Sequence, residues 1–273
     1  MSSIKSRKKN TIQTFIQKKS KSEKITVLTA YDYFIASILD TAGIDAILVG
    51  DSASNVLHGH MNTIPMTMEI MIAHTAAVSR GTENALVIGD MPFLSYQPSD
   101  ELAILNAGRF LKEGFAEAVK LEGGLEMAER VKKIVDSGIP VMGHIGLTPQ
   151  SIHKFGGPKV QGKKKKSKEY LIDSALALED AGCFSIVLEL LEAETAKEIT
   201  EKLKTTATIG IGAGSECDGQ VLVINDMLGL RPDNFNPKFL REYANLTPTI
   251  KKAVEQYIAD VQSGNYPNKD ESF

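Results

Sequence analysis

The sequence is poor in cysteine, in long apolar runs and in net basic charge, and each shortage excludes a class of protein. Its two cysteines, Cys183 and Cys217, provide neither a disulfide framework nor the ligand spacing of a zinc site, so we expect reduced thiols in a cytoplasmic protein. No apolar run approaches the roughly 18 residues of a membrane-spanning helix. The net charge of −3 argues against general nucleic-acid binding, which depends on a basic surface. We therefore expect neither a membrane nor a nucleic acid as partner.

The N-terminal segment lacks acidic residues as far as Glu23, while its lysines are frequent. Targeting peptides with this shortage of acids are usually rich in arginine rather than lysine. Ile12, Phe15 and Ile16 have the i, i+3, i+4 spacing of an apolar helix face. We predict a short amphipathic helix over residues 11–18 that belongs to the folded domain.

No stretch rich in Gly, Ser or Pro divides the chain, so we predict one domain over residues 1–273. Within it, short apolar runs typical of buried parallel strands alternate with amphipathic stretches typical of helices. The alternation predicts an α/β protein. Eight such units in 273 residues favour a single (β/α)8 TIM barrel, preceded by the short N-terminal helix, over an open doubly wound sheet. The predicted strands cover residues 25–31, 46–50, 85–89, 116–121, 139–145, 184–188, 207–211 and 221–224.

Polar side chains stand where the apolar runs end. In a (β/α)8 barrel the carboxyl ends of the strands converge on one mouth, where active sites are built. Several carboxylates that converge there repel one another unless a cation lies among them, and oxygen ligands favour a hard cation such as Mg²⁺. We therefore predict a Mg²⁺ site that also holds a chelating substrate. The polar residues that follow or close a predicted strand are Asp51, Asp90, Glu122, His144 and Glu189.

Each of these residues also has a plain structural interpretation. An acid directly after a strand often caps the next helix, and capping is sufficient to explain any one of the acids alone. Lys120 and Glu122 share one face of a strand, so they can form a simple ion pair or can neutralise a substrate carboxylate or oxyanion. A single histidine such as His144 can be a core residue, while its place at a strand end favours a functional role equally.

At these residues the chain resembles the ketopantoate hydroxymethyltransferase family. The resemblance extends from about residue 11 to the end, and so many segments in the same order make it specific. The segments are TAYDY (29–33), LVGDS (48–52), HTAAV (74–78), DMPF (90–93), KLEGG (120–124), GHIGLTPQS (143–151), FGGPKVQG (155–162), VLE (187–189), IGIGAG (209–214), DGQ (218–220) and SGNYP (263–267).

The resemblance implies a (β/α)8-barrel transferase, usually assembled as a homodecamer. The family transfers a hydroxymethyl group from 5,10-methylenetetrahydrofolate to 3-methyl-2-oxobutanoate. The products are tetrahydrofolate and 2-dehydropantoate, which leads to pantothenate. By position, the resemblance implies that Asp51, Asp90 and Glu122 bind magnesium, that Asp51, Ser52, Asp90, Lys120 and His144 line the pocket of the 2-oxo acid, and that Glu189 is the catalytic proton acceptor.

The chemistry of a Mg²⁺-stabilised enolate fits these residues. A 2-oxo acid chelated to Mg²⁺ through its keto oxygen and a carboxylate oxygen has an acidified C3 proton, because the metal, with Lys120 and His144 nearby, stabilises the developing negative charge. Glu189 would remove this proton, which requires a partly desolvated carboxylate. Two departures from the family pattern, Ser54 in place of a glycine and Met61 in place of an aspartate, lie in the loop after the second strand.

Two other interpretations stay open. One is a lyase or mutase of the phosphoenolpyruvate mutase and isocitrate lyase type, although the catalytic cysteine motif of those enzymes is not evident. The other is a non-catalytic barrel that binds a 2-oxo acid. The irregular stretch 147–167 predicts a long loop of a kind that is often functional. Solvation alone explains its lysines at 163–166, and attraction of the polyglutamate tail of a folate is the functional alternative.

Overall fold

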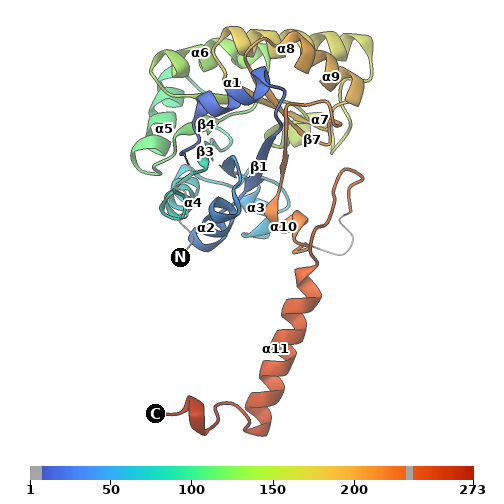
Figure 1. The fold of residues 1–273 in the computed structure, drawn as a ribbon. Helices are drawn as coiled ribbons and strands as arrows, with labels where there is room; N and C mark the ends of the chain where they lie inside the picture. The colour runs from blue at the N-terminus through green and yellow to red at the C-terminus, as the bar shows by residue number, and fades with distance from the viewer. Residues whose placement is uncertain (1–7, 232–235) are drawn as a thin grey trace. The chain divides into compact units, whose positions relative to one another are not determined.

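The computed structural model describes residues 8–231 and 236–273 and contains a closed barrel of eight parallel strands (Figure 1). The strands are hydrogen-bonded in sequence order, and β8 closes the barrel on β1. The predicted (β/α)8 barrel is therefore confirmed, with strand boundaries within about three residues of the predicted ones. The strands are β1 Ile25–Thr29, β2 Ala46–Val49, β3 Leu86–Asp90, β4 Ala118–Lys120, β5 Val141–Gly146, β6 Ser185–Glu189, β7 Ala207–Ile211 and β8 Gly219–Leu222.

The helices of the barrel begin and end at recognisable local signals. Asp32 caps α2, since its carboxylate accepts a hydrogen bond from Ile35 N at 2.9 Å, and Gly43 ends the helix with a φ of 98°. Ser99 caps α5 in the same way. The helical elements of this part are α1 Ile12–Ser20, α2 Tyr33–Ala42, α3 Ala53–Val56, α4 Met68–Arg80, α5 Asp100–Lys112, η1 Leu125–Met127, α6 Ala128–Asp136, η2 Pro149–Ser151, α7 Ile152–Phe155, α8 Lys165–Asp180 and α9 Ala193–Lys202.

The N-terminal helix α1 belongs to the core, as the sequence predicts. Phe15 is fully buried, and its ring packs edge-on against that of Phe184 with a centroid distance of 5.3 Å. It joins an apolar cluster supplied by inward-facing residues of the strands, among them Val27, Leu48 and Ile88.

The predicted irregular stretch 147–167 is partly wrong. It contains η2 and α7, and α8 begins at Lys165, so Lys165 and Lys166 are helical. Leu171 and Leu178 hold α8 against the barrel by burial, whereas the residue before the helix, Lys164, provides no side-chain cap. The start of α8 therefore has no local sequence signal.

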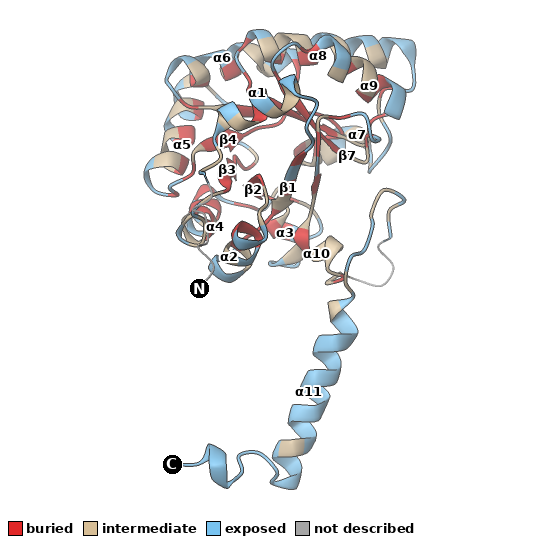
Figure 2. Cartoon of the chain, in the orientation of Figure 1, coloured by how far each residue is buried: buried red, intermediate tan, exposed pale blue. Residues whose placement is uncertain are grey.

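The chain divides into two compact units, Met1–Val223 with the barrel and Ile224–Phe273. The second unit contains α10 Ile224–Met227, α11 Leu246–Ser263 and η3 Lys269–Glu271. Figure 2 shows α11 exposed along nearly its whole length. The assignment of residues 1–273 to one domain stays a prediction. Among the described residues, no helix has the length and apolar character needed to cross a membrane.

Candidate active site at the carboxyl ends of the strands

The barrel brings the predicted site residues to one end. Parallel strands have their carboxyl ends at the same mouth, so residues at the ends of neighbouring strands meet there. Asp90 closes β3 and stands in register with Lys120, which closes β4. The others follow or close their strands in the same way: Asp51 and Ser52 after β2, Glu122 after β4, His144 within β5 and Glu189 at the end of β6.

Asp90 links three neighbouring strands through its carboxylate. Lys120 Nζ donates to Asp90 Oδ1 at 2.7 Å, and both side chains are almost fully buried. Asp51 N donates to Asp90 Oδ2 at 3.0 Å. Neither Asp51 nor Asp90 caps a helix, so the capping interpretation of these two acids is wrong.

Two residues that sequence reasoning missed, Gln150 and Tyr96, connect the acids. The Gln150 side chain donates through Nε2 to Asp51 Oδ2 at 3.0 Å, and its backbone N donates to Glu122 Oε2 at 3.0 Å. Tyr96 donates its hydroxyl to Gln150 Oε1 at 2.8 Å. Gln150 lies within the motif GHIGLTPQS, so a signal was present, but spacing gives no information on where a side chain in a turn points.

His144 lies between two carboxylates. Its Nδ1 is 3.5 Å from Glu122 Oε1, and its Nε2 is 3.3 Å from Glu189 Oε2. Both ring nitrogens and Glu122 Oε1 are buried without a hydrogen-bond partner among the described residues. Burial and Lys120 alone would lower the pKa of His144, but the two carboxylates outweigh them and raise it to about 9. The imidazole is therefore charged at neutral pH and pairs with both acids.

The crowded acids oppose one another's ionisation. Burial and the nearby charge of Asp90 raise the pKa of Asp51 well above its usual range. Burial alone would lower the pKa of Lys120, but Asp90, Glu122 and Asp51 raise it, so the ammonium is firmly charged. Such a mouth favours one more cation.

Glu189 occupies a tightly constrained backbone position. The next residue, Leu190, has a φ of 46°, which is unfavourable for a side chain with a branched γ carbon. A Cβ at Gly146 would lie 2.2 Å from Glu189 O, so only glycine fits beside this strand end. The Glu189 side chain is 19% exposed, and its Oε2 lies 3.3 Å from the buried Nε2 of His144. Its role as the proton acceptor stays a prediction.

The loop after β2 places the remaining polar groups. Ser52 Oγ and Tyr31 Oη share a hydrogen bond of 2.8 Å, which orients the serine hydroxyl at the mouth. Ser54 is fully buried, and its Oγ donates to Asn62 O at 2.7 Å, so this side chain ties the loop to itself. Met61 is 95% exposed and contributes no group to the site.

The donor set fits a magnesium ion. Glu122 Oε1 is a buried carboxylate oxygen without a hydrogen-bond partner in the described part of the chain, and Asp51 lies close enough to Asp90 for their charges to repel. No three His, Cys, Asp or Glu side chains of the described part form a ready metal cage. Mg²⁺ does not require one, because it is commonly held by one or two carboxylates together with water and substrate oxygens.

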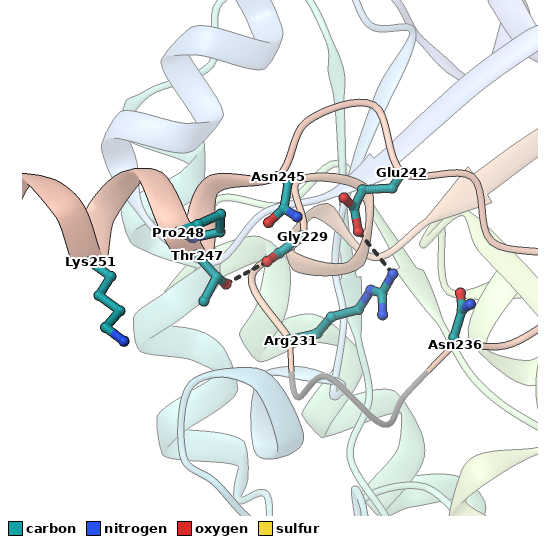
Figure 3. Close-up of a pocket in the computed structure, with 8 residues that line it drawn as sticks. All are labelled: Gly229, Arg231, Asn236, Glu242, Asn245, Thr247, Pro248 and Lys251. Atoms are coloured by element: carbon teal, nitrogen blue, oxygen red, sulfur yellow. Dashed lines mark hydrogen bonds and ion pairs between the residues drawn. The ribbon is translucent and has the colours of Figure 1, made fainter.

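Two other features of the chain lie apart from this chemistry. Burial raises the pKa of Cys183 to about 12 and that of Cys217 to about 11, so neither thiol is an activated nucleophile. A cavity of about 420 Å³ is built wholly from the second unit, where Arg231 pairs with Glu242 at 3.0 Å and Thr247 donates to Gly229 O at 2.6 Å (Figure 3). None of the predicted site residues lines it.

Comparison with known sequences identifies close relatives. A sequence model described as ketopantoate hydroxymethyltransferase matches residues 9–269. The chain is 56% identical over 255 residues to the 3-methyl-2-oxobutanoate hydroxymethyltransferase of Syntrophus aciditrophicus, with 93% of each chain covered. It is 55% identical over 267 residues to the protein of the same name from Chlorobaculum parvum, with 96% of each chain covered.

Comparison with solved structures shows a shared fold at low sequence identity. A 2,3-dimethylmalate lyase, a member of the PEP mutase/isocitrate lyase superfamily, matches with a TM-score of 0.60 at 16% identity over 96% of this chain and 91% of that one. A phosphonopyruvate hydrolase in complex with oxalate and Mg²⁺ matches with a TM-score of 0.61 at 10% identity over 96% and 93% of the two chains. These likenesses establish the barrel fold and no more.

Proposed function

The chain belongs to the ketopantoate hydroxymethyltransferase family, and we propose that the buried acids at the mouth of its barrel carry out the reaction of that family as follows. It is a 3-methyl-2-oxobutanoate hydroxymethyltransferase of pantothenate biosynthesis. The observation that supports the route best is a pair of neighbouring contacts at the mouth: Lys120 is paired with Asp90, and His144 lies between Glu122 and Glu189.

The small 2-oxo acid binds inside the mouth through its carboxylate and keto oxygens. Lys120 supplies a buried, permanently charged donor, and Ser52 presents a hydroxyl that Tyr31 orients. Asp51, Asp90 and Glu122 would hold Mg²⁺ there. The ion supplies a positive charge that offsets the crowded carboxylates and makes the C3 proton of the bound substrate more acidic.

Glu189 removes the C3 proton of the substrate. Its carboxylate is partly exposed and is 3.3 Å from His144 Nε2, so the imidazolium holds it in place and limits its approach to the deeper acids. Water first adds to the methylene carbon of 5,10-methylenetetrahydrofolate, both C–N bonds to that carbon break, and tetrahydrofolate leaves the unit as formaldehyde. The carbanion at C3 then adds to the carbonyl carbon of this unit, and the proton held by Glu189 goes to the new alkoxide oxygen, which becomes the hydroxyl of the product.

We further propose that the protein is a homo-oligomer of the cytoplasm. Helix α11 presents an apolar stripe at i, i+4, i+7, i+8 and i+11, formed by Ile250, Val254, Tyr257, Ile258 and Val261, each 45–57% exposed. A continuous apolar stripe on a surface helix is a typical association face. The decamer is the expected size, and light scattering after size-exclusion chromatography measures it. The buried free thiols Cys183 and Cys217 suit a reducing compartment.

A coupled assay tests the proposed route. Purified protein receives 3-methyl-2-oxobutanoate and 5,10-methylenetetrahydrofolate with Mg²⁺ or with EDTA, and 2-dehydropantoate is followed by mass. We expect product only when both the folate and the metal are present. Product formation unchanged in EDTA would remove the metal from the route. Product formed without folate would contradict the assignment of 5,10-methylenetetrahydrofolate as the one-carbon donor.

A lyase or mutase reaction is less well supported. The solved structures of that superfamily share the barrel at 10–16% identity, which carries no information on activity. Burial raises the pKa of both cysteines of this chain, so neither thiol is activated as the catalytic thiol of such an enzyme has to be.

A further inference from the structure

Four consecutive lysines at the mouth of the barrel take no part in the site described above. This lysine cluster consists of Lys163, Lys164, Lys165 and Lys166, all exposed. It spans the end of the connection from β5 to α8 and the start of α8. Since the helices of the barrel run back from the carboxyl ends of the strands, the start of α8 lies at the same end as the site.

The backbone ties this cluster to the strand end that bears Glu189. Gln161 N donates to Leu190 O at 2.7 Å, and Glu192 N donates to Gln161 O at 2.9 Å, so residue 161 pairs with the chain directly after Glu189. Thr195 Oγ1 donates to Gly162 O at 3.1 Å and fixes the next residue. Two residues span at most about 7 Å, so the cluster begins at the rim of the site.

The positive charge of the cluster is not neutralised within the described part of the chain. Lys163, Lys164 and Lys166 have no ion pair there, and Lys165 only approaches Glu169 at 4.0 Å. The next lysine along the helix, Lys168, is by contrast paired with Glu198 at 2.7 Å.

The cluster also stands where lysine is least favourable for the helix. The amino end of a helix carries a partial positive charge, so acids stabilise it and lysines destabilise it. The first turn of α8 contains no acid, and no side chain caps it. Within the described residues these cations therefore have little to offset their mutual repulsion, and they are available to an anionic ligand.

We propose that the lysine cluster is a subsite for the oligo-γ-glutamate tail of the folate donor, an inference that rests on the proposed function. A folate carries its one-carbon unit at one end and its glutamates at the other. With the one-carbon unit beside Glu189, the tail extends outward over the rim. Each added glutamate contributes one carboxylate, and several carboxylates on a flexible chain match several mobile lysines.

The 2-oxo acid does not fit the cluster. It is small, carries a single carboxylate and is bound by buried groups deeper in the mouth, where Lys120 already provides the cation. A ligand of the cluster has to carry several negative charges and to reach from the interior to the surface.

The test compares donors with one and five glutamates. At low ionic strength we expect the wild-type KM for the pentaglutamyl donor to be about tenfold lower than that for the monoglutamyl donor, because several weak exposed pairs act together. Changing all four lysines of the cluster to Gln should bring the ratio of the two KM values close to one. kcat and the KM for the monoglutamyl donor should stay unchanged. In the wild type, the ratio should also shrink in 0.5 M salt.

A matched control removes four lysines from the other end of the barrel. Lys132, Lys133, Lys202 and Lys204 are exposed near the carboxyl ends of their helices or just before a strand. Changing them to Gln removes the same charge and should preserve the tenfold ratio. The subsite is overturned if the wild type has equal KM values for both donors, or if the cluster and control variants lose the KM ratio to the same extent. The transferase function stands in either case. If the wild type forms product with neither donor, both the subsite and the proposed function are contradicted.

Discussion

Acidic side chains gather at both ends of the barrel, and their partners differ. At the amino ends of the strands, the Asp40 carboxylate accepts hydrogen bonds from the backbone N–H groups of Glu83, Asn84 and Ala85, at 2.6–3.2 Å. At the carboxyl ends, Asp51 shares a pocket with Asp90 and Glu122, and their charges repel one another. Both sets are buried, so burial alone does not distinguish a stabilising acid from a functional one.

The amino-end acids fasten the turns that lead into the strands. Glu179 accepts from the backbone N–H groups of Lys204, Thr205 and Thr206 just before β7. Burial alone would raise the pKa of Glu179, but these hydrogen bonds outweigh it and lower the pKa. An acid whose charged form is fully bonded stabilises the fold.

Helix α1 contributes to the same end. Lys18 pairs with Asp45 at 2.6 Å, and Lys19 pairs with Asp218 at 2.8 Å. Asp45 also accepts from Thr26 N at 2.8 Å. The carboxyl-end acids also have partners, such as Lys120 and Gln150, but they crowd one another, and Glu122 Oε1 has no hydrogen-bond partner among the described residues, so they remain able to bind a cation.

The largest effect that separates the two ends concerns Glu189. Changing Glu189 to Gln removes the proton acceptor, and kcat should fall about a thousandfold. The midpoint of thermal unfolding should change little, because the carboxylate is partly exposed and not bonded to backbone N–H groups. Glu194→Gln, an exposed acid in the first turn of α9, is the control and should leave kcat unchanged. Normal turnover by Glu189→Gln would exclude the assigned role.

The next largest effect is a loss of free energy of unfolding, and only a change at the amino ends of the strands should cause it. In the wild type, backbone N–H groups point at the Asp40 carboxylate. Asp40→Asn places an amide NH₂ group against some of these donors, and this loss of hydrogen bonds should lower the free energy of unfolding by about 2 kcal/mol. Thermal unfolding should then begin about 5 °C lower, while kcat per folded molecule is unchanged. A loss of kcat without a loss of stability would contradict the division between the ends.

The sequence predicts the two ends to different degrees. The strand ends follow from the apolar runs, and β7 coincides with the predicted range 207–211, so Asp51, Asp90 and Glu189 could be placed at one mouth in advance. Their partners could not, because Gln150 and Tyr96 reach the acids from separate loops and nothing local determines where their side chains point. Contacts set by tertiary packing carry no periodic signal.

The amino end was missed altogether. Asp40 and Glu179 lie within helices, where an acid looks like any solvated surface residue, and their backbone partners come from segments 25 to 45 residues away. Only the closed barrel brings those turns to the carboxylates. The same limitation explains the start of α8, whose position depends on packing rather than on a cap.

A smaller effect, of opposite sign, is expected at the carboxyl end. Asp51→Asn removes one of the crowded charges, so in EDTA it should raise the free energy of unfolding by about 1 kcal/mol, while activity is lost. Mg²⁺ together with 3-methyl-2-oxobutanoate should raise the unfolding midpoint of the wild type but not that of the variant. Destabilisation comparable to that of Asp40→Asn would mean that Asp51 is a structural acid after all.

The smallest effect is the pH dependence of the two changes in free energy of unfolding, caused by Asp40→Asn and by Asp51→Asn. Its sign follows from the pKa shifts of the two aspartates. Burial alone would raise the pKa of Asp40, but its hydrogen bonds lower it below the usual 3.8, so its stabilisation is present above that value and is lost as the pH falls through the lowered pKa. The pKa of Asp51 is raised, so its cost to stability is absent below about pH 3.8, grows as the pH rises from that value towards the raised pKa, and is constant above it.

Urea unfolding in EDTA between pH 4 and pH 8 measures both differences against the wild type. The loss of free energy of unfolding caused by Asp40→Asn should be constant over this range and should become smaller only at more acidic pH. The gain in free energy of unfolding from Asp51→Asn should be near zero at pH 4 and should increase as the pH rises towards the raised pKa, because the aspartate ionises freely in the unfolded chain while burial and Asp90 oppose its ionisation in the folded protein. A gain that is independent of pH would show that packing, rather than charge, sets the stability of the carboxyl end. The acids at the two ends would then differ only in position.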